Sequence, residues 1–136
     1  MKSRNEKLMQ LAQKALDGDG AIWIKEGQSI LDAYNGQIAA LSVTVALSGL
    51  RPALAIYYQD KPNAGTKRKA YRRTVLNLIA RMITQDDEYH NNPDGSEALL
   101  RHALDESTDL KFLKKEVIEC AIALKQVVRT YNLVSK

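Results

Sequence analysis

The residues whose types and spacing could do chemistry are the basic ones between positions 61 and 81. This stretch carries seven Lys and Arg side chains and no Asp or Glu. A helix over Lys67–Thr84 would place one stripe of polar residues every four positions, about 6 Å apart along its axis and opposite its apolar side: Lys69, Arg73, Asn77 and Arg81. Such a row suits a phosphate backbone, because each neutralised phosphate releases counterions. We therefore predict contact with a nucleic-acid backbone through the basic residues of this stretch: Lys67, Arg68, Lys69, Arg72, Arg73 and Arg81.

The segment that follows has the opposite charge. Residues 82–110 carry eight acidic side chains and one basic one. The run Asp86, Asp87 and Glu88 is typical of a solvated loop. It could also pair with the basic surface of a neighbouring copy, and two opposite faces on one molecule give a head-to-tail contact. We assign these three residues to self-association.

The inventory of reactive residues argues against an enzyme. The chain has two histidines and one cysteine, and no pair of them has metal-ligand spacing. His90 lies near three acids, but in a segment expected to be an exposed loop, whereas catalysis needs a preorganised site. Cys120 lies on an apolar helical stripe and is expected in the core, and Trp23 and Phe112 are expected to pack there too. We predict a non-catalytic protein with no metal and no cofactor.

The elements that must position these residues are helices. Periodic apolar spacing and few glycines and prolines predict helical segments with short loops between them. Their expected ranges are Ser3–Leu16, Ala21–Leu47, Arg51–Gln59, Lys67–Thr84, Gly95–Leu104 and a last helix from about Ser107 to Tyr131. No strand-like alternation is found. The predicted fold is an all-α, single-domain helical bundle of about five to six helices that spans residues 1–136.

The same sequence predicts a cytoplasmic chain. Its first ten residues are charged and do not resemble a signal peptide. The longest weakly polar run, Ile38–Leu47, is about half of what a membrane span needs. The single Cys120 cannot form an internal disulfide and indicates a reducing compartment.

Two stretches resemble the small subunit of the Cmr-type (type III-B) CRISPR RNA-guided effector complex. One runs from Tyr34 to Gln59 and reads YNGQIAALSVTVALSGLRPALAIYYQ. The other runs from Phe112 to Tyr131 and reads FLKKEVIECAIALKQVVRTY. The residues that match the family's pattern are Tyr34, Gly49, Leu50, Leu54, Ala55, Tyr57, Glu116, Leu124 and Lys125. The resemblance implies a helical subunit for antiviral defence that is present in several copies. These stack along the effector and contact guide and target RNA and other subunits, while a different subunit cuts the target.

Two other functions fit the sequence. A free-standing DNA-binding regulator could place the basic helix in a major groove, although only Thr74 and Asn77 would then be able to read bases among the charged residues. A scaffold could present the same basic face to an acidic protein. A sequence-specific operator would favour the first, and assembly without RNA would favour the second.

Overall fold

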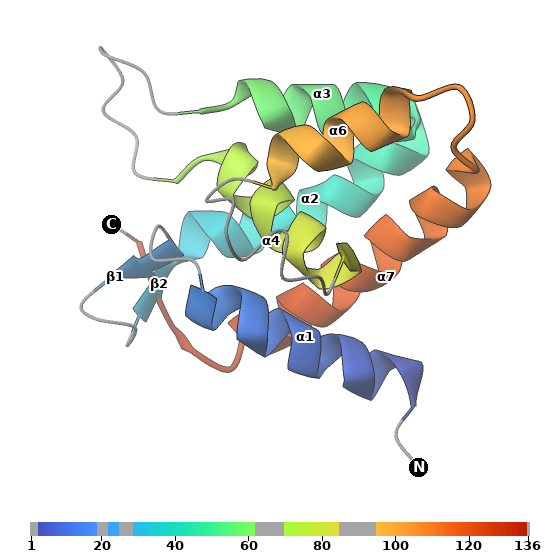
Figure 1. The fold of residues 1–136 in the computed structure, drawn as a ribbon. Coiled ribbons are helices and arrows are strands. Elements are labelled where there is room, and N and C mark those ends of the chain that lie inside the picture. The colour runs from blue at the N-terminus through green and yellow to red at the C-terminus, as the bar shows by residue number, and fades with distance from the viewer. Residues whose placement is uncertain (1–2, 19–21, 25–28, 62–69, 85–94, 136) are drawn as a thin grey trace.

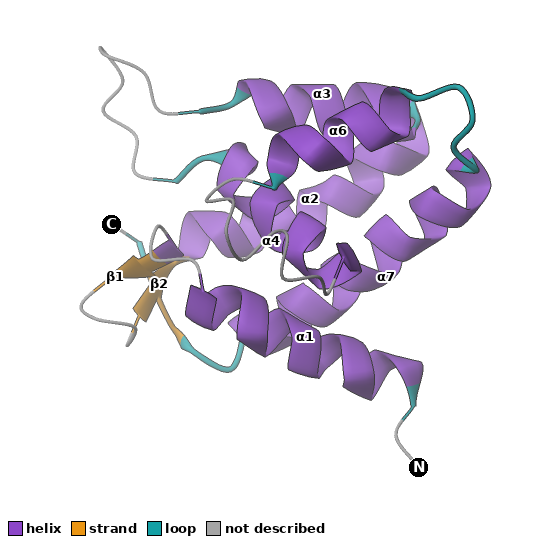
Figure 2. Cartoon of the chain, viewed as in Figure 1, coloured by secondary structure: helices purple, strands orange, loops and turns teal. Residues whose placement is uncertain are grey.

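The computed structural model describes residues 3–18, 22–24, 29–61, 70–84 and 95–135. The described helices are α1 (Arg4–Gly18), α2 (Asp32–Ser48), α3 (Leu50–Gln59), α4 (Arg72–Thr84), α6 (Ser96–Leu104) and α7 (Leu110–Val128). They form an all-α domain, as the sequence predicts (Figures 1 and 2). Their buried side chains make one apolar cluster to which all six helices contribute.

The expected ranges of most helices are close to the observed ones, and local residues explain where the helices begin and end. Gly49 has a φ of 89° between α2 and α3, a conformation that glycine adopts without a steric penalty. Its N–H donates to the carbonyl oxygen of Val45. Asp109 caps α7 by accepting a hydrogen bond from the N–H of Phe112. The segment expected at Gly95–Leu104 is observed as α6, with Gly95 as an N-cap that offers no side-chain hydrogen bond.

The prediction of a continuous helix over Ala21–Leu47 is wrong at its beginning. Trp23–Ile24 forms β1 and Ser29–Leu31 forms β2, and α2 begins only at Asp32. β2 pairs antiparallel with β1 and parallel with β3 (Asn132–Val134), with Ile30 opposite Leu133. The partner strand is about a hundred residues away in the sequence, so a local pattern could not reveal the pairing. The strands are also too short for alternation, and all three residues of β2 are buried.

Helix α4 lies in the middle of the domain rather than on its surface. It packs against α1, α2, α3, α6 and α7, and Figure 1 shows it between these elements. Every residue from Val75 to Ala80 is buried. A helix that is buried on all sides has no solvent face for a polar stripe.

Candidate nucleic-acid interface

The predicted exposed stripe on α4 is therefore wrong at its centre. Asn77 is only 5% exposed, and its side-chain oxygen accepts a hydrogen bond of 2.6 Å from the backbone N–H of Gly95. This bond fixes the chain entering α6 against α4. Asn77 is polar because a buried backbone donor needs an acceptor, and not because it faces solvent.

The arginines at the beginning of α4 hold the end of α3. The guanidinium of Arg73 lies 3.7 Å from the centre of the Tyr58 ring, and its Nε donates a 2.6 Å hydrogen bond to the Tyr58 carbonyl oxygen. Arg72 forms an ion pair of 3.3 Å with Asp60, whose carboxylate also accepts a 2.9 Å bond from the Arg72 N–H. Both arginines are half-buried. The predicted RNA contacts of these two residues would have to form with guanidinium groups that already bind the protein.

Arg81, at the other end of α4, lies against the end of α1. One of its terminal nitrogens is 3.1 Å from where a Cβ on Gly18 would lie, and its Nε is buried. The other predicted contact residues, Lys67, Arg68 and Lys69, lie outside the described residues, as do Asp86, Asp87, Glu88 and His90.

A basic surface that the stripe prediction missed lies on α7. It consists of the cations on the side of the helix that faces solvent and α2, and we call it the α7 basic face: Lys111, Lys114, Lys115, Lys125 and Arg129. Lys125 is half-buried and the other four are exposed. The face extends over eighteen helical steps, about 27 Å.

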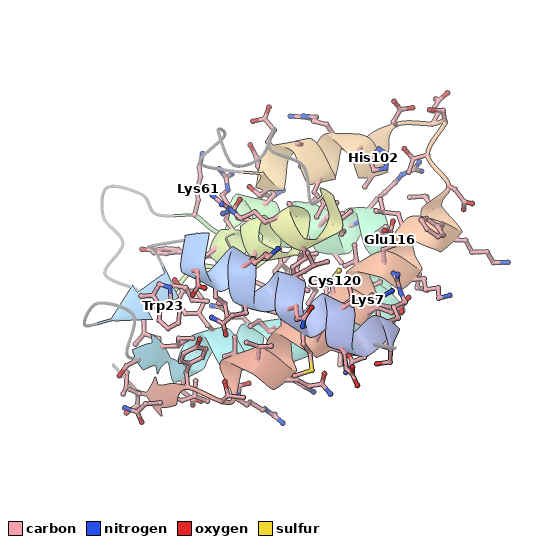
Figure 3. The ribbon with its side chains drawn as sticks, turned by 60° about the horizontal axis from the view of Figure 1, so that its bottom comes forward. Lys7, Trp23, Lys61, His102, Glu116 and Cys120 are labelled. Atoms are coloured by element: carbon pink, nitrogen blue, oxygen red, sulfur yellow. The ribbon has the colours of Figure 1, made fainter. Side chains whose placement is uncertain are left out.

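The acidic residues of α7 lie next to this face, toward α1. Glu119 forms a 2.8 Å ion pair with Arg4 of α1. Glu116 is half-buried and lies at the same end of the two helices as Lys7 of α1 (Figure 3). Glu119 lies one turn after Lys115, so the acids border the α7 basic face along the edge toward α1. The sequence signal for this face was present, since residues 111–136 carry six basic and two acidic side chains, but the denser run at 61–81 concealed it.

The position of one of these lysines, Lys111, is not explained by helix stability. Lys111, Lys114 and Lys115 lie in the first two turns of α7. The N-terminal end of a helix carries a partial positive charge, so cations there are unfavourable. Of the three, Lys111 lies in the first turn, where this charge acts, and its place there is easier to understand if it binds an anion from outside.

Phe112 lies among these lysines and is 59% exposed. The prediction that it packs in the core is wrong, because the apolar stripe of α7 passes through Leu113 and Val117 instead. Trp23 packs against the core as predicted and is half-buried. Its N–H donates to the carbonyl oxygen of Leu16, and its ring meets the Tyr131 ring edge to face at 4.9 Å.

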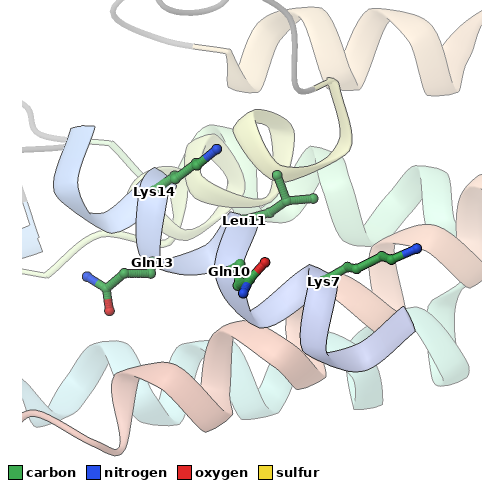
Figure 4. A pocket seen from close by; sticks show the side chains of 5 residues that line it. All are labelled: Lys7, Gln10, Leu11, Gln13 and Lys14. Atoms are coloured by element: carbon green, nitrogen blue, oxygen red, sulfur yellow. The ribbon is translucent and has the colours of Figure 1, made fainter. Parts of the chain in front are cut away.

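A second, smaller basic surface is a shallow groove of about 520 Å³ along α1. Its lining side chains are Lys7, Gln10, Leu11, Gln13 and Lys14 (Figure 4). Glu6 and Asp17 on the same helix reduce its net charge, so the groove attracts anions less than α7 does.

The described residues offer little for catalysis. They contain no group of three or more His, Cys, Asp or Glu placed to hold a metal ion. Cys120 is buried, as predicted, and burial, helped by the nearby Glu116 carboxylate, raises the pKa of its thiol to about 12. A thiol with such a pKa stays protonated and is a poor nucleophile. Among the described helices, none is both long and apolar enough to cross a membrane.

Comparison of the chain with models of protein families, with curated proteins and with solved structures gives no significant match. The resemblance to the type III-B small subunit therefore depends on the two stretches alone. In the fold, Tyr34–Gln59 covers most of α2 and all of α3, and Phe112–Tyr131 covers most of α7.

Proposed function

We propose that this protein is a non-catalytic subunit that binds the RNA backbone through the α7 basic face. The observation that carries the proposal is the gathering of cations on one side of α7. Five cations share one side of the helix. The two acids, Glu116 and Glu119, border it toward α1, where Glu119 is paired with Arg4.

The chemistry of this face suits phosphate more than bases. Four of its five cations are lysines, which act as strongly hydrated point charges without a fixed hydrogen-bond geometry. Contacts of this kind position a nucleic acid and carry no sequence information. The expected binding is weak, independent of sequence and strongly reduced by salt.

The resemblance to the type III-B small subunit adds to the proposal the complex in which the protein would act. As the small subunit of a type III-B effector in the cytoplasm, the protein would lie along the guide–target RNA in several copies, stacked on one another and on other subunits, and would serve antiviral defence. The matching stretch Phe112–Tyr131 includes four of the five cations of the α7 basic face, which supports the assignment of RNA contact to this helix.

The alternative of a regulator with α4 in a DNA groove is not favoured. A recognition helix must leave one side open to enter the major groove, and five other helices pack around α4.

The test compares two triple variants with the same change in charge. The first carries Lys111→Gln, Lys114→Gln and Lys115→Gln, and the control neutralises three lysines elsewhere, Lys7, Lys14 and Lys61, all of them exposed. Affinity for RNA is measured by fluorescence anisotropy between 50 and 200 mM salt. Five phosphate contacts predict a slope of log affinity against log salt of about −3.5 on single strands and −4.5 on duplexes.

The α7 variant should lower the magnitude of this slope by about 2–3 and the control by less than about 1. Equal losses in the two variants would mean that only net charge matters. A loss confined to the control would move the interface to the surface that carries Lys7, Lys14 and Lys61.

A further inference from the structure

Helix α2 has a solvent face without charge. After Asp32 no charged residue occurs until Arg51. The residues of this face recur at intervals of three and four, the spacing of a heptad seam, and we call them the α2 seam: Ala33, Gly36, Ala40, Val43 and Leu47. All five are exposed, and Leu47 is 82% and Val43 57% exposed.

Neighbouring helices extend the seam on both sides. Of the six large apolar side chains that are exposed in the described residues, four are here: Val43, Leu47, Ile56 of α3 and Ile122 of α7. Arg129 donates to the side-chain oxygen of Asn35 at 3.2 Å, and α2 and α7 run in opposite directions (Figure 1). Ile122 is seven residues from Arg129 along α7, and Ser42 is seven residues from Asn35 along α2. Because both helices rise by the same distance per residue, Ile122 is level with Ser42, in the middle of the seam.

The size of the seam residues changes along the helix, so that two copies of the seam are complementary in shape. Its N-terminal half has small residues, Ala33, Gly36 and Ala40, and its C-terminal half has the large Val43 and Leu47. If two seams pair antiparallel, Leu47 faces Gly36 of the other copy and Val43 faces Ala40. A Cβ at Gly36 would meet nothing within 4 Å, so the space above it is open for the partner side chain. Parallel pairing would instead place large against large and small against small.

The size and charge of the face also suit a second copy. A helix of 17 residues is about 25 Å long, and flanking helices at 8–10 Å on each side make it about 20 Å wide. Two such faces cover about 1,000 Å², the lower limit for a specific interface. No charge of the seam would be buried without a partner.

We propose that the protein forms a weak two-fold dimer in which the α2 seams of two copies pair antiparallel. This inference goes beyond RNA binding, because it assigns a role to the α2 seam, which meets the α7 basic face only at Ile122. The two-fold axis of such a pair crosses α2 at a right angle, so α7 lies on the same side in both copies. The two basic faces would then flank one another, and repulsion between them should make the dimer tighter at higher salt.

The first test is sedimentation equilibrium of the full chain at increasing concentration and at two salt concentrations. We expect reversible dimerisation that salt strengthens, the opposite of its effect on RNA binding. Val43→Glu should weaken the dimer about thirtyfold or more, as for an interface hot spot. The control Leu104→Glu, an exposed apolar site on α6, should leave it unchanged.

Gly36→Leu separates dimerisation from folding. The new side chain fills the space for Leu47 of the partner and should weaken the dimer at least about tenfold. The melting temperature of the monomer should rise, since glycine is unfavourable in a helix and a Cβ meets nothing here. A variant that dimerises as well as the wild type would overturn the pairing.

Disulfide formation tests the direction of pairing. A mixture of Ala40→Cys and Val43→Cys chains should form the mixed disulfide in preference to either symmetric one. Cys120 is buried with a pKa of about 12 and should not compete. Preferred symmetric disulfides would show parallel pairing and refute the model, as would a wild type that stays monomeric at every concentration. RNA binding at nanomolar chain concentration should be the same in Val43→Glu and wild type; its loss there would count against the proposed RNA surface and not against the dimer.

Discussion

Arg73 distinguishes a structural from an RNA-binding role for α4, and Arg73→Ala is the most direct test. Its stacking on the Tyr58 ring at 3.7 Å is worth about 0.5–2 kcal/mol. Its 2.6 Å bond to the Tyr58 carbonyl oxygen is a charge-assisted hydrogen bond to one of the last four carbonyls of α3, which have no partner within the helix, and contributes about 1.5–3 kcal/mol. Since these contributions overlap, we expect a loss of about 2–4 kcal/mol.

For a chain of this size the loss corresponds to a fall of roughly 8–16 °C in melting temperature. It is measured by thermal and urea unfolding followed by circular dichroism. A double-mutant cycle with Tyr58→Leu separates the ring contact from the carbonyl bond, because that variant removes the ring and keeps the carbonyl. Arg73→Lys should recover only part of the loss, since an ammonium group lacks the planar fork.

An exposed Arg73, as the sequence alone predicted, would lose less than about 0.5 kcal/mol. A melting temperature within 2 °C of wild type, together with lost RNA binding, would therefore refute the structural role. If the role is structural, RNA affinity per folded molecule at low temperature should stay the same.

Leu78→Ala and Leu124→Ala should each destabilise the domain by about 2–5 kcal/mol, because both side chains are fully buried; a nearly unchanged urea midpoint would show that the residue faces solvent. The thiol of Cys120 has its pKa raised by burial from an ordinary value near 9 to about 12, so the unfolded chain gives up this proton first. The contribution of the Cys120 thiol to the free energy of unfolding is therefore complete below pH 9. Up to about 4 kcal/mol of it is lost as the pH rises toward 12. Cys120→Ala should make the decline over this range smaller, with a remainder from Tyr57, whose pKa burial also raises; an identical decline in variant and wild type would contradict the assignment.

The sequence predicted the helices well because their signals are local. The apolar spacing of Leu113, Val117 and Leu124 fixes α7, and the sequence around Gly49 ends α2 as expected. The strands β1, β2 and β3 were not predictable, because Ile30 is paired with Leu133 across the whole chain. Periodicity shows that a helix has an apolar side, and it does not show whether the other side is also covered.

This limit explains the error about α4. Its apolar side was predicted from residues such as Val75 and Ile79, which are buried. Asn77 on the opposite side is equally buried, because α6 enters there and needs its side-chain oxygen. A polar residue in a helical repeat is thus compatible with solvent and with a buried hydrogen bond, and only the tertiary packing decides between them.

The arginines and the lysines of this protein have different surroundings, and the difference supports α7 rather than α4 as the RNA-binding helix. Arg73 binds the carbonyl end of α3, and Arg81 lies against the last residue of α1. Arg51 donates to the carbonyl oxygens of Ala103 and Asp105 at the end of α6, at 2.8 and 3.4 Å. The C-terminal end of a helix carries a partial negative charge and unpaired carbonyls, so a guanidinium group stabilises it as it would an anion. The property of arginine that suggested phosphate binding is therefore used within the fold at two helix ends, by Arg73 and Arg51. Within the described part of the chain the lysines of α7 have no such role, and they remain available to an external polyanion.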